Sequence, residues 1–294
     1  MSRADAGAPD TARALAREAA ARLAAAGVPD PESDAELLLR HVLSTGRAAL
    51  HRDPERPVDA MAAAAYRALV TRRAARTPIQ HLTGVQEFWS LAFEVTPDVL
   101  IPRPETEHLV EAFLAIPVGA SPRVVELGTG SGCLAVVAAL ERPGAAVVAT
   151  DTSRAALEVA ARNATRHGVA ARIRFVEGDL LLPLRGLGLA GGVDVLLSNP
   201  PYIPDGDLAG LEPEVRDHEP LTALTPGPDG LAAHRRIATG APEFLRPGGH
   251  LVVEIGLGQA AAARSLYEEA GFEVLAIRPD LAGIERVVVA RRRP

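Results

Sequence analysis

The stretch Val124-Val125-Glu126-Leu127-Gly128-Thr129-Gly130-Ser131-Gly132 decides the fold of this chain. Its branched apolar residues predict a buried strand, and the glycines that follow predict a tight turn. Glycines let the backbone approach a ligand closely, and the first N–H groups of a helix have no partner inside that helix. The stretch therefore predicts a strand, a ligand-binding loop and a helix in direct succession.

The spacing of the glycines indicates the ligand. A dinucleotide fingerprint has the spacing G-x-G-x-x-G, which from Gly128 requires a small residue where the chain has Cys133. Here the spacing is G-x-G-x-G, which resembles the S-adenosylmethionine loop of class I methyltransferases. We expect S-adenosylmethionine as the cofactor and assign the following loop residues to its binding: Glu126, Gly128, Thr129, Gly130, Ser131 and Gly132.

Two aspartates follow the next predicted strands. Asp151 ends the second strand, where a carboxylate can accept hydrogen bonds from both ribose hydroxyls of a nucleotide. Asp179 ends the third strand and can accept from the adenine amino group, with Leu180 packed on the ring. Each aspartate alone is equally well explained as a helix cap or a turn residue. Together with the glycine loop they favour a nucleotide-type cofactor.

The second half of the chain alternates short apolar runs with helical patterns, which predicts a parallel sheet covered on both faces. Strands are predicted at residues 123–127, 146–150, 173–177, 193–198, 250–255, 273–277 and 286–290. Helices are predicted at residues 105–115, 131–141, 153–167, 231–245 and 258–270. Only a short loop joins the last two strands, so they must be antiparallel. The expected class is α/β, a Rossmann-like class I methyltransferase sheet, mostly parallel with the last strand antiparallel.

The N-terminal region has a different pattern. Helical spacing covers residues 11–26 and 58–76, and Ser33 with Glu36 predicts a capping box at the start of a helix between them. Residues 88–95 are typical of extended structure, for which a hairpin is one candidate. We predict a helical domain over residues 1–80, a hairpin and linker over 81–104, and a cofactor-binding catalytic domain over 105–294.

Composition limits the remaining possibilities. The 294 residues are 48% hydrophobic with a net charge of −6, without the strong basic patch of most nucleic-acid-binding proteins. The one cysteine, Cys133, excludes an internal disulfide, and the scattered histidines argue against a metal site. No apolar run is long enough to span a membrane. We expect a cytoplasmic monomer that binds neither membrane nor nucleic acid directly.

Ser198-Asn199-Pro200-Pro201-Tyr202 follows the fourth predicted strand and should face the cofactor. An amide or exocyclic amino nitrogen is a poor nucleophile because its lone pair is delocalised. The Asn199 side-chain carbonyl and the Pro200 backbone carbonyl can accept its two N–H groups. Pro201 stiffens the turn, and Tyr202 offers a flat face for the planar group. We assign catalysis to Asn199, Pro200 and Tyr202, with Pro201 as a further substrate contact and Asn199 also near the cofactor.

With these motifs the chain resembles the glutamine-N5 methyltransferases that act on class-1 peptide chain release factors. The resemblance covers nearly the whole chain, with matching residues at 77–84, 97–107, 128–132, 198–204, 211–217, 229–231 and 280–286. It implies that Asn199, Pro200 and Tyr202 hold the glutamine of the Gly-Gly-Gln motif and that the N-terminal helices help to grip the release factor. His218 and Leu221 depart from the family's frequent tyrosine and arginine, which leaves contacts from that loop open.

Three other functions fit part of this pattern. A sister enzyme could methylate a glutamine of a ribosomal protein, but residues 103–107 favour the release-factor branch. An enzyme acting on an exocyclic amine of DNA or RNA could use a similar Asn-Pro-Pro-aromatic turn. The net negative charge of the chain argues against such a nucleic-acid substrate. A cofactor-binding scaffold without turnover is the third, and the intact Asn199 and Tyr202 argue against it.

Overall fold

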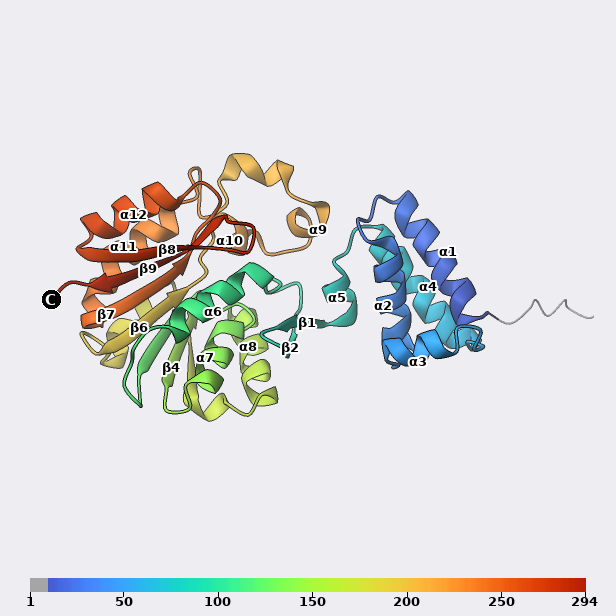
Figure 1. Cartoon of the computed structure of the whole chain (residues 1–294), viewed down its shortest axis with the longest axis horizontal. Helices are drawn as coiled ribbons and strands as arrows, with labels where there is room; N and C mark the ends of the chain where they lie inside the picture. Colours follow the sequence, from blue (N-terminus) through green and yellow to red (C-terminus); the bar gives the residue numbers. More distant parts are fainter. Residues whose placement is uncertain (1–9) are drawn as a thin grey trace, which may run out of the picture. The chain divides into compact units, whose positions relative to one another are not determined.

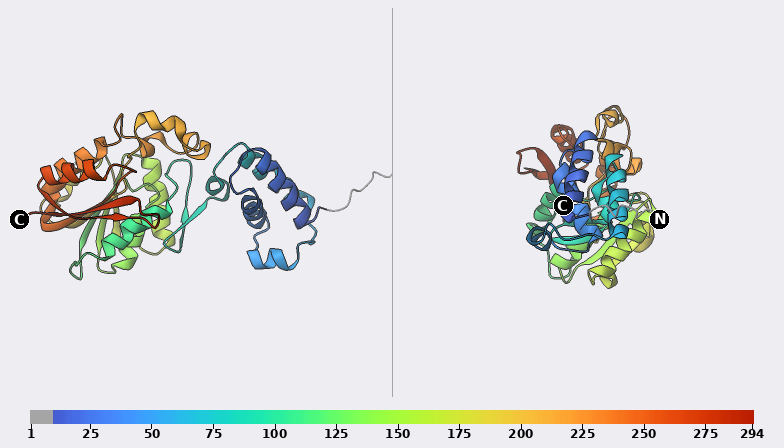
Figure 2. Two further views of the ribbon diagram at one scale, coloured as in Figure 1. Left: turned by 45° about the horizontal axis from the view of Figure 1, so that its top comes forward. Right: turned by 90° about the vertical axis from the view of Figure 1, so that its right-hand side faces the viewer.

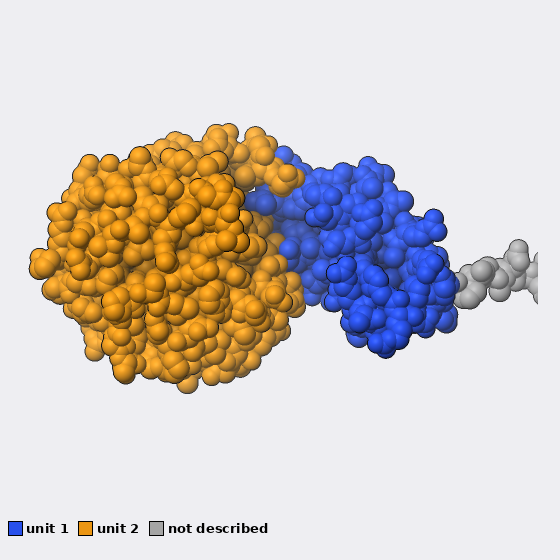
Figure 3. Space-filling view, in the orientation of Figure 1, with its two compact units in different colours: residues 1–84, 213–218 blue, residues 85–212, 219–294 orange. Residues whose placement is uncertain are grey.

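The computed structural model describes residues 10–294, which form two compact units. Unit 1 comprises the described residues up to Gly84 together with Pro213–His218, and unit 2 comprises Val85–Glu212 and Glu219–Pro294. Figure 3 shows the two units in different colours. The first nine residues of the predicted helical domain lie outside the described part of the chain.

Unit 1 is built from short helices that pack around an apolar core. Its helices are α1 (Ala12–Ala25), α2 (Pro31–Val42), α3 (Arg47–Arg52), α4 (Ala60–Ala74), α5 (Ile79–Thr83) and α9 (Pro213–Arg216). Leu15 and Leu23 lie on the same face of α1 and are both buried, as is Leu38 of α2. The Tyr66 ring of α4 closes this core, and its hydroxyl donates to the Ala35 carbonyl at 3.0 Å.

Two features of unit 1 differ from the sequence prediction. The capping box at Ser33 is wrong, because α2 begins at Pro31 with Asp30 as its N-cap. Proline suits the first helical position, since its fixed φ is helical and its missing N–H would have no partner there. Glu36 instead lies within the helix and binds Arg47 at 3.0 Å. The short helix α3 was not predicted, because six residues are too few to show the helical repeat of apolar side chains.

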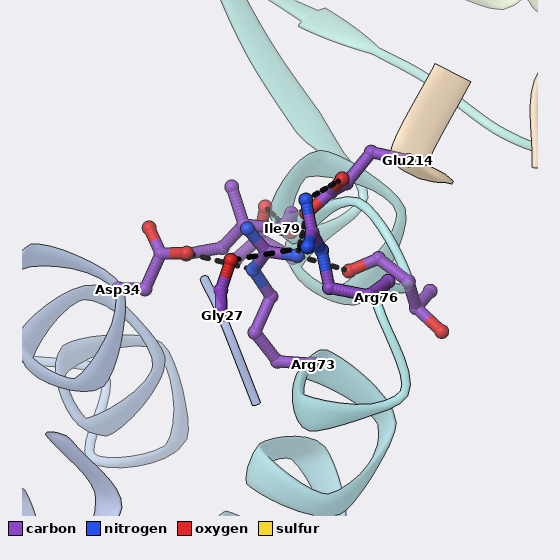
Figure 4. A network of polar contacts seen from close by, with 8 residues as sticks. Gly27, Asp34, Arg73, Arg76, Ile79 and Glu214 are labelled. Carbon is purple, nitrogen blue, oxygen red and sulfur yellow. Dashed lines mark hydrogen bonds and ion pairs between the residues drawn. The ribbon is translucent and has the colours of Figure 1, made fainter. Parts of the chain in front are cut away.

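A buried ion network holds α9 within unit 1 (Figure 4). Arg73 is only 6% exposed; its Nε donates to Asp34 at 2.7 Å and its Nη1 to Glu214 at 2.6 Å. Arg76 binds Glu214 through both carboxylate oxygens, at 2.7 and 2.6 Å, and donates to the Gly27 carbonyl. Burial raises the pKa of Glu214, but hydrogen bonds from Arg76 and Arg73 outweigh it and lower the pKa to about 2.

We expect Glu214→Gln to lower the free energy of unfolding by about 2–3 kcal/mol, because it removes the carboxylate charge that pairs with both Arg73 and Arg76 in a buried network. The stabilisation from Glu214 should be complete above its unfolded pKa near 4.5 and be lost as the pH falls towards 2. Urea unfolding followed by circular dichroism at pH 7 and pH 3 measures both effects. Asp217→Asn in the same segment is the control, since Asp217 pairs with Arg216 at the surface and should change stability little. Equal losses in the two variants would contradict the network's role.

Unit 2 begins with a β-hairpin and continues as alternating strands and helices (Figure 1). Its strands are β1 (Val85–Phe88), β2 (Leu91–Glu94), β3 (Arg123–Leu127), β4 (Ala146–Asp151), β5 (Ile173–Glu177), β6 (Val193–Ser198), β7 (Leu245–Glu254), β8 (Phe272–Pro279) and β9 (Glu285–Arg292). Its α-helices are α6 (Glu107–Leu114), α7 (Cys133–Glu141), α8 (Arg154–Arg166), α10 (Leu221–Leu224), α11 (Ala232–Phe244) and α12 (Ala260–Glu269). Short 3-10 turns are η1 (Pro104–Thr106), η2 (Ala170–Arg172), η3 (Leu182–Leu187) and η4 (Asp205–Gly210).

The main sheet has seven strands in the described residues, in the order β5-β4-β3-β6-β7-β9-β8. The pairs from β5 to β7 are parallel, and β9 is antiparallel to both of its neighbours. This confirms the predicted α/β class and the antiparallel last strand. Residues 88–95 do form part of a hairpin, in which β1 and β2 pair antiparallel.

Helices cover both faces of this sheet (Figure 2), and a hydrophobic core lies between the helices and the sheet on each face. Alternate residues of each central strand enter opposite cores: Val195 and Leu197 pack with α6 and α7, while Leu196 packs with α11 and α12. Burial on both faces explains why these strands read as continuous apolar runs. The carboxyl ends of β3, β4, β5 and β6 therefore meet at one edge of a rigid layer.

Two element boundaries were predicted wrongly. The predicted strand at 250–255 is the second half of β7, which starts at Leu245 and carries an irregular register opposite Val193. Its Pro247-Gly248-Gly249 sequence is typical of a turn, but here it forms an irregularity within the strand. The predicted helix at 105–115 begins as the turn η1 and becomes α-helical at Glu107. No helix among residues 10–294 has the length and apolar content to cross a bilayer.

Candidate active site

The glycine loop between β3 and α7 has backbone angles that favour glycine. Gly128, Gly130 and Gly132 have φ of +71°, +52° and +80°. A Cβ on Gly132 would lie 2.8 Å from the Ala160 Cβ, so a side chain there would push α8 away. The amides of Gly128 and Thr129 both donate to the Thr150 carbonyl at 2.9 Å. These two bonds tie the loop to the end of the neighbouring strand.

Asp151 receives backbone donors on both carboxylate oxygens. Gly130 N–H donates to Oδ2 and Ser153 N–H donates to Oδ1, each at 2.9 Å. Burial raises the pKa of the carboxyl, and these N–H groups act in the opposite direction. Each carboxylate oxygen has a second lone pair, which leaves capacity for further donors such as a pair of hydroxyls.

A cavity of 290 Å³ opens at the carboxyl ends of the central strands. The predicted site residues that line it are Gly128, Gly130, Asp151, Asp179, Leu180, Asn199 and Pro201. A Cβ on Gly128 or Gly130 would meet no atom within 4 Å, so a side chain at either position would occupy open cavity space. The absence of side chains here, beside a carboxylate, fits the nucleoside part of S-adenosylmethionine.

Four of the predicted cofactor contacts do not line the cavity: Gly132 of the loop, and the buried side chains of Glu126, Thr129 and Ser131. Glu126 is 1% exposed and accepts a hydrogen bond from the Thr129 hydroxyl at 2.6 Å. Burial raises the pKa of Glu126 to about 8, against the effect of that bond. Ser131 is also buried, and its carbonyl accepts from Asn163. We propose that these side chains act on the cofactor indirectly, by shaping the loop.

Asp179 and Leu180 lie at the cavity edge after β5. Asp179 Oδ2 accepts from Arg236 of α11 at 2.7 Å, which leaves Oδ1 for another donor. Leu180 has a positive φ of 49°, uncommon for a residue with a Cβ, and its carbonyl accepts from the Thr150 hydroxyl at 3.0 Å. The backbone strain thus coincides with a side chain that lines the cavity.

The Asn-Pro-Pro-Tyr turn follows β6. The Ser198 hydroxyl donates to the Leu127 carbonyl at 2.9 Å, which fixes the turn to the glycine-loop strand. Asn199 lines the cavity, and its Nδ2 donates to the Thr106 hydroxyl at 3.0 Å. Pro200 is buried and Pro201 lines the cavity. The turn therefore places Asn199 in the same cavity as the glycine loop.

Tyr202 is held from two sides. Its hydroxyl donates to Glu254 at 3.2 Å, and its backbone carbonyl accepts from the Gln259 amide at 2.9 Å. A Cβ on Gly256 would lie 3.0 Å from the Tyr202 ring, which leaves room only for glycine without a shift of the ring. Burial and the nearby Glu254 raise the pKa of the phenol, so Tyr202 stays protonated.

Sequence reasoning missed several residues that build this site. The side chains of Thr106, Asn163, Arg236, Glu254 and Gln259 support the loops described above. Thr106 lies within residues 101–107, the end of the stretch 97–107 that matches the family, so its signal was present. Asn163 and Arg236 lie in helices, Glu254 ends a strand and Gln259 is the N-cap of α12, and only their neighbours in space reveal their roles.

The 101–107 motif is anchored by a buried carboxylate. Arg103 donates to Glu219 at 2.7 Å, and the Ile101 amide donates to the same carboxyl at 3.4 Å. Burial raises the pKa of Glu219, and the charge of Arg103 opposes the shift. Glu105 of this motif is exposed. In the described part of the chain, no group of three or more histidine, cysteine or acidic side chains is arranged to hold a metal.

This sheet order, with a glycine loop and an acidic strand end around one cavity, defines a class I S-adenosylmethionine-dependent methyltransferase. Its fold is similar to that of a solved methyltransferase from Pyrococcus furiosus, with a TM-score of 0.52, 19% identity and coverage of 78% of this chain and 98% of that one. The Methyltransferase small domain family matches residues 104–209, and the PrmC N-terminal domain family matches residues 14–84.

Two full-length relatives narrow this class. A release factor glutamine methyltransferase from Cereibacter sphaeroides is 47% identical over 94% of this chain and 96% of the relative. One from Burkholderia pseudomallei is 51% identical over 86% of this chain and 89% of the relative. The chain belongs to the release factor glutamine methyltransferase family.

Proposed function

We propose that this protein transfers a methyl group from S-adenosylmethionine to the side-chain amide nitrogen (N5) of the glutamine in the Gly-Gly-Gln motif of class-1 peptide chain release factors. The position of Asn199 carries the proposal, because its amide lines the same cavity as Gly128 and Asp151. An amide acceptor for the substrate and a nucleotide-binding loop thus share one cavity. The full-length relatives named for release factor glutamine methylation support the substrate.

The reaction requires that the glutamine amide be oriented more than that its nitrogen be activated. When bound, S-adenosylmethionine supplies a methyl group on a positively charged sulfur. The Asn199 side-chain oxygen and the Pro200 carbonyl accept the two N–H groups of the glutamine amide and so direct its lone pair at that methyl. These hydrogen bonds strengthen as the nitrogen gains positive character, which lowers the barrier. The methylated nitrogen is acidic and releases its proton afterwards, so no general base is needed before transfer.

Asp151 and the glycine loop hold the cofactor in this proposal. The carboxylate accepts the ribose hydroxyls, and the side-chain-free face of the loop admits the rest of the nucleoside. Asp179 Oδ1 accepts from the adenine amino group, and Leu180 packs on the ring. The Tyr202 ring, held by Glu254 and Gln259, provides the flat wall against the planar glutamine amide.

Mass spectrometry of a class-1 release factor tests the substrate directly. The purified protein is incubated with the release factor and S-adenosylmethionine, and the peptides are sequenced. We expect a mass gain of one methylene group on the Gly-Gly-Gln glutamine and none when that glutamine is replaced by alanine. Ribosomal proteins, transfer RNA and DNA are run as parallel substrates. Methylation of any of these in preference to the release factor would contradict the proposal.

We also propose that the protein acts as a cytoplasmic monomer, with unit 1 contributing to release-factor binding. The net charge of −6 supports a protein partner over a phosphate backbone. Size-exclusion chromatography with light scattering measures the oligomeric state of the free protein and of its mixture with release factor. A one-to-one complex is expected.

A further inference from the structure

Behind Asn199 lies a chain of buried polar side chains, to which the proposed mechanism gives no role beyond holding the Tyr202 ring. Thr106 of η1 is 3% exposed and Glu254 at the end of β7 is 1% exposed. Asn199 Nδ2 donates to Thr106 Oγ1 at 3.0 Å, and the Tyr202 hydroxyl donates to Glu254 Oε1 at 3.2 Å. The Thr106 hydroxyl also interacts with the Glu254 carboxyl and lowers its pKa, while Oε2 of that carboxyl has no hydrogen-bond partner in the described part of the chain. Buried polar groups at this depth must be paired, so the direction of each bond matters.

The number of protons fixes those directions. A threonine hydroxyl has one proton to donate and lone pairs to accept, whereas an ionised carboxylate only accepts. The Thr106 proton is therefore directed to Glu254, because the buried Oε2 of that carboxylate is an acceptor that lacks a donor. The Thr106 oxygen is then left to accept, and the group facing it must be the NH2 of Asn199.

This fixes the orientation of the Asn199 amide. With Nδ2 committed to Thr106, the carbonyl oxygen Oδ1 is the atom available to the cavity that Asn199 lines. A flipped amide would present an NH2 group there instead. Two donors cannot bond to each other, so a flipped Asn199 would repel the N–H groups of a substrate amide.

We infer that Thr106 and Glu254 are positioning residues, which hold the Asn199 amide with its oxygen towards the substrate and so select a group that donates N–H. The inference rests on the proposed role of Asn199 in glutamine methylation. It gives a function to a buried carboxylate that touches neither cofactor nor substrate. It also explains why residue 106 is a threonine, whose hydroxyl takes part in this chain, and not an apolar residue of the same shape.

The protonation of Glu254 supplies an independent readout. Burial raises its pKa to about 7, against hydrogen bonds from Thr106 and Tyr202 and the charge of Arg286, while the charge of Glu105 adds to the rise. A protonated Glu254 can donate to Thr106, which then turns its own proton towards Asn199. The orientation is lost in that state, so kcat should fall as the pH drops through about 7.

Paired substitutions at Thr106 separate its hydroxyl from its methyl. Thr106→Val keeps the shape and removes the hydroxyl, and we expect kcat for the release factor to fall by about 10- to 100-fold, the effect of one or two lost buried hydrogen bonds. Thr106→Ser keeps the hydroxyl and should restore most of the rate. Both should bind S-adenosylmethionine within about two-fold of the wild type, since Thr106 does not line the cavity. Equal losses in the two variants, or an active Thr106→Val, would overturn the inference.

The pH profile gives the second test, which also serves if Thr106→Val fails to fold. Glu254→Gln cannot ionise, so the fall in kcat below pH 7 should disappear while the rate at pH 8 decreases. A wild-type profile in this variant would contradict the inference. The wild-type enzyme in the same assay separates the two proposals. If it does not methylate the release factor, the proposed function fails; if it does and the variants behave as wild type, only the role of Thr106 and Glu254 fails.

Discussion

Replacing Asn199 with alanine should lower kcat for release-factor methylation by about 10²- to 10³-fold, as for the loss of one oriented group in a preorganised site. The variant loses the side-chain acceptor that aligns the glutamine nitrogen, and Thr106 loses the NH2 group that it accepts from. The KM for release factor should rise much less, because most of the protein–protein contact is unaffected.

The control for Asn199→Ala is its affinity for S-adenosylmethionine, measured by calorimetry. We expect it within about five-fold of the wild type, because Gly128, Gly130 and Asp151 are unchanged. Thermal unfolding checks that the fold is intact. Unchanged methyl transfer in this variant would remove the mechanism, whereas a loss of cofactor affinity equal to the loss of rate would make Asn199 a cofactor ligand alone.

Replacing Asp151 with asparagine should weaken S-adenosylmethionine binding by about 100-fold, as expected for two charge-assisted hydrogen bonds. One side-chain oxygen becomes an NH2 group that faces either the Gly130 or the Ser153 N–H, so the loop is also loosened. At saturating cofactor the rate should recover most of its value, since the amide pocket is intact. Titration calorimetry and the KM for the cofactor measure the change.

A matched carboxylate elsewhere in unit 2 shows whether the effect is specific. Asp229→Asn removes one charge at a half-exposed position that pairs with Arg235 and does not line the cavity. We expect its cofactor affinity to match the wild type. Equal weakening in Asp151→Asn and Asp229→Asn would indicate a general effect of charge rather than a ribose contact.

The sheet and the positions of the strand ends were predictable because they depend on local patterns. The apolar runs at 123–127, 173–177 and 193–198 coincide with β3, β5 and β6 to the residue. Burial on both faces makes the runs of β3 and β6 continuous, and a glycine or asparagine follows each of the three strands. Elements without a local period were missed or misplaced, as α3 and the first half of β7 show.

The candidate site was predictable only in part, for a similar reason. Residues that follow a strand, such as Asp151 and Asn199, are placed by the topology of the sheet. Residues that reach the site across the fold are not: Thr106 and Asn199 are far apart in sequence, as are Glu254 and Tyr202. The hydrogen bond between Glu126 and Thr129 beneath the loop was also not predictable from the sequence. The strand pattern predicts which face of the sheet Glu126 lies on, but not which side chain it contacts.

A crystal structure with S-adenosylhomocysteine and a Gly-Gly-Gln peptide tests the central claim most directly. The account predicts that the glutamine nitrogen lies about 3 Å from both Asn199 Oδ1 and the Pro200 carbonyl oxygen. It also predicts that this nitrogen faces the sulfur of the bound product. A glutamine whose nitrogen lies elsewhere, or an Asn199 amide turned into the core, would contradict it.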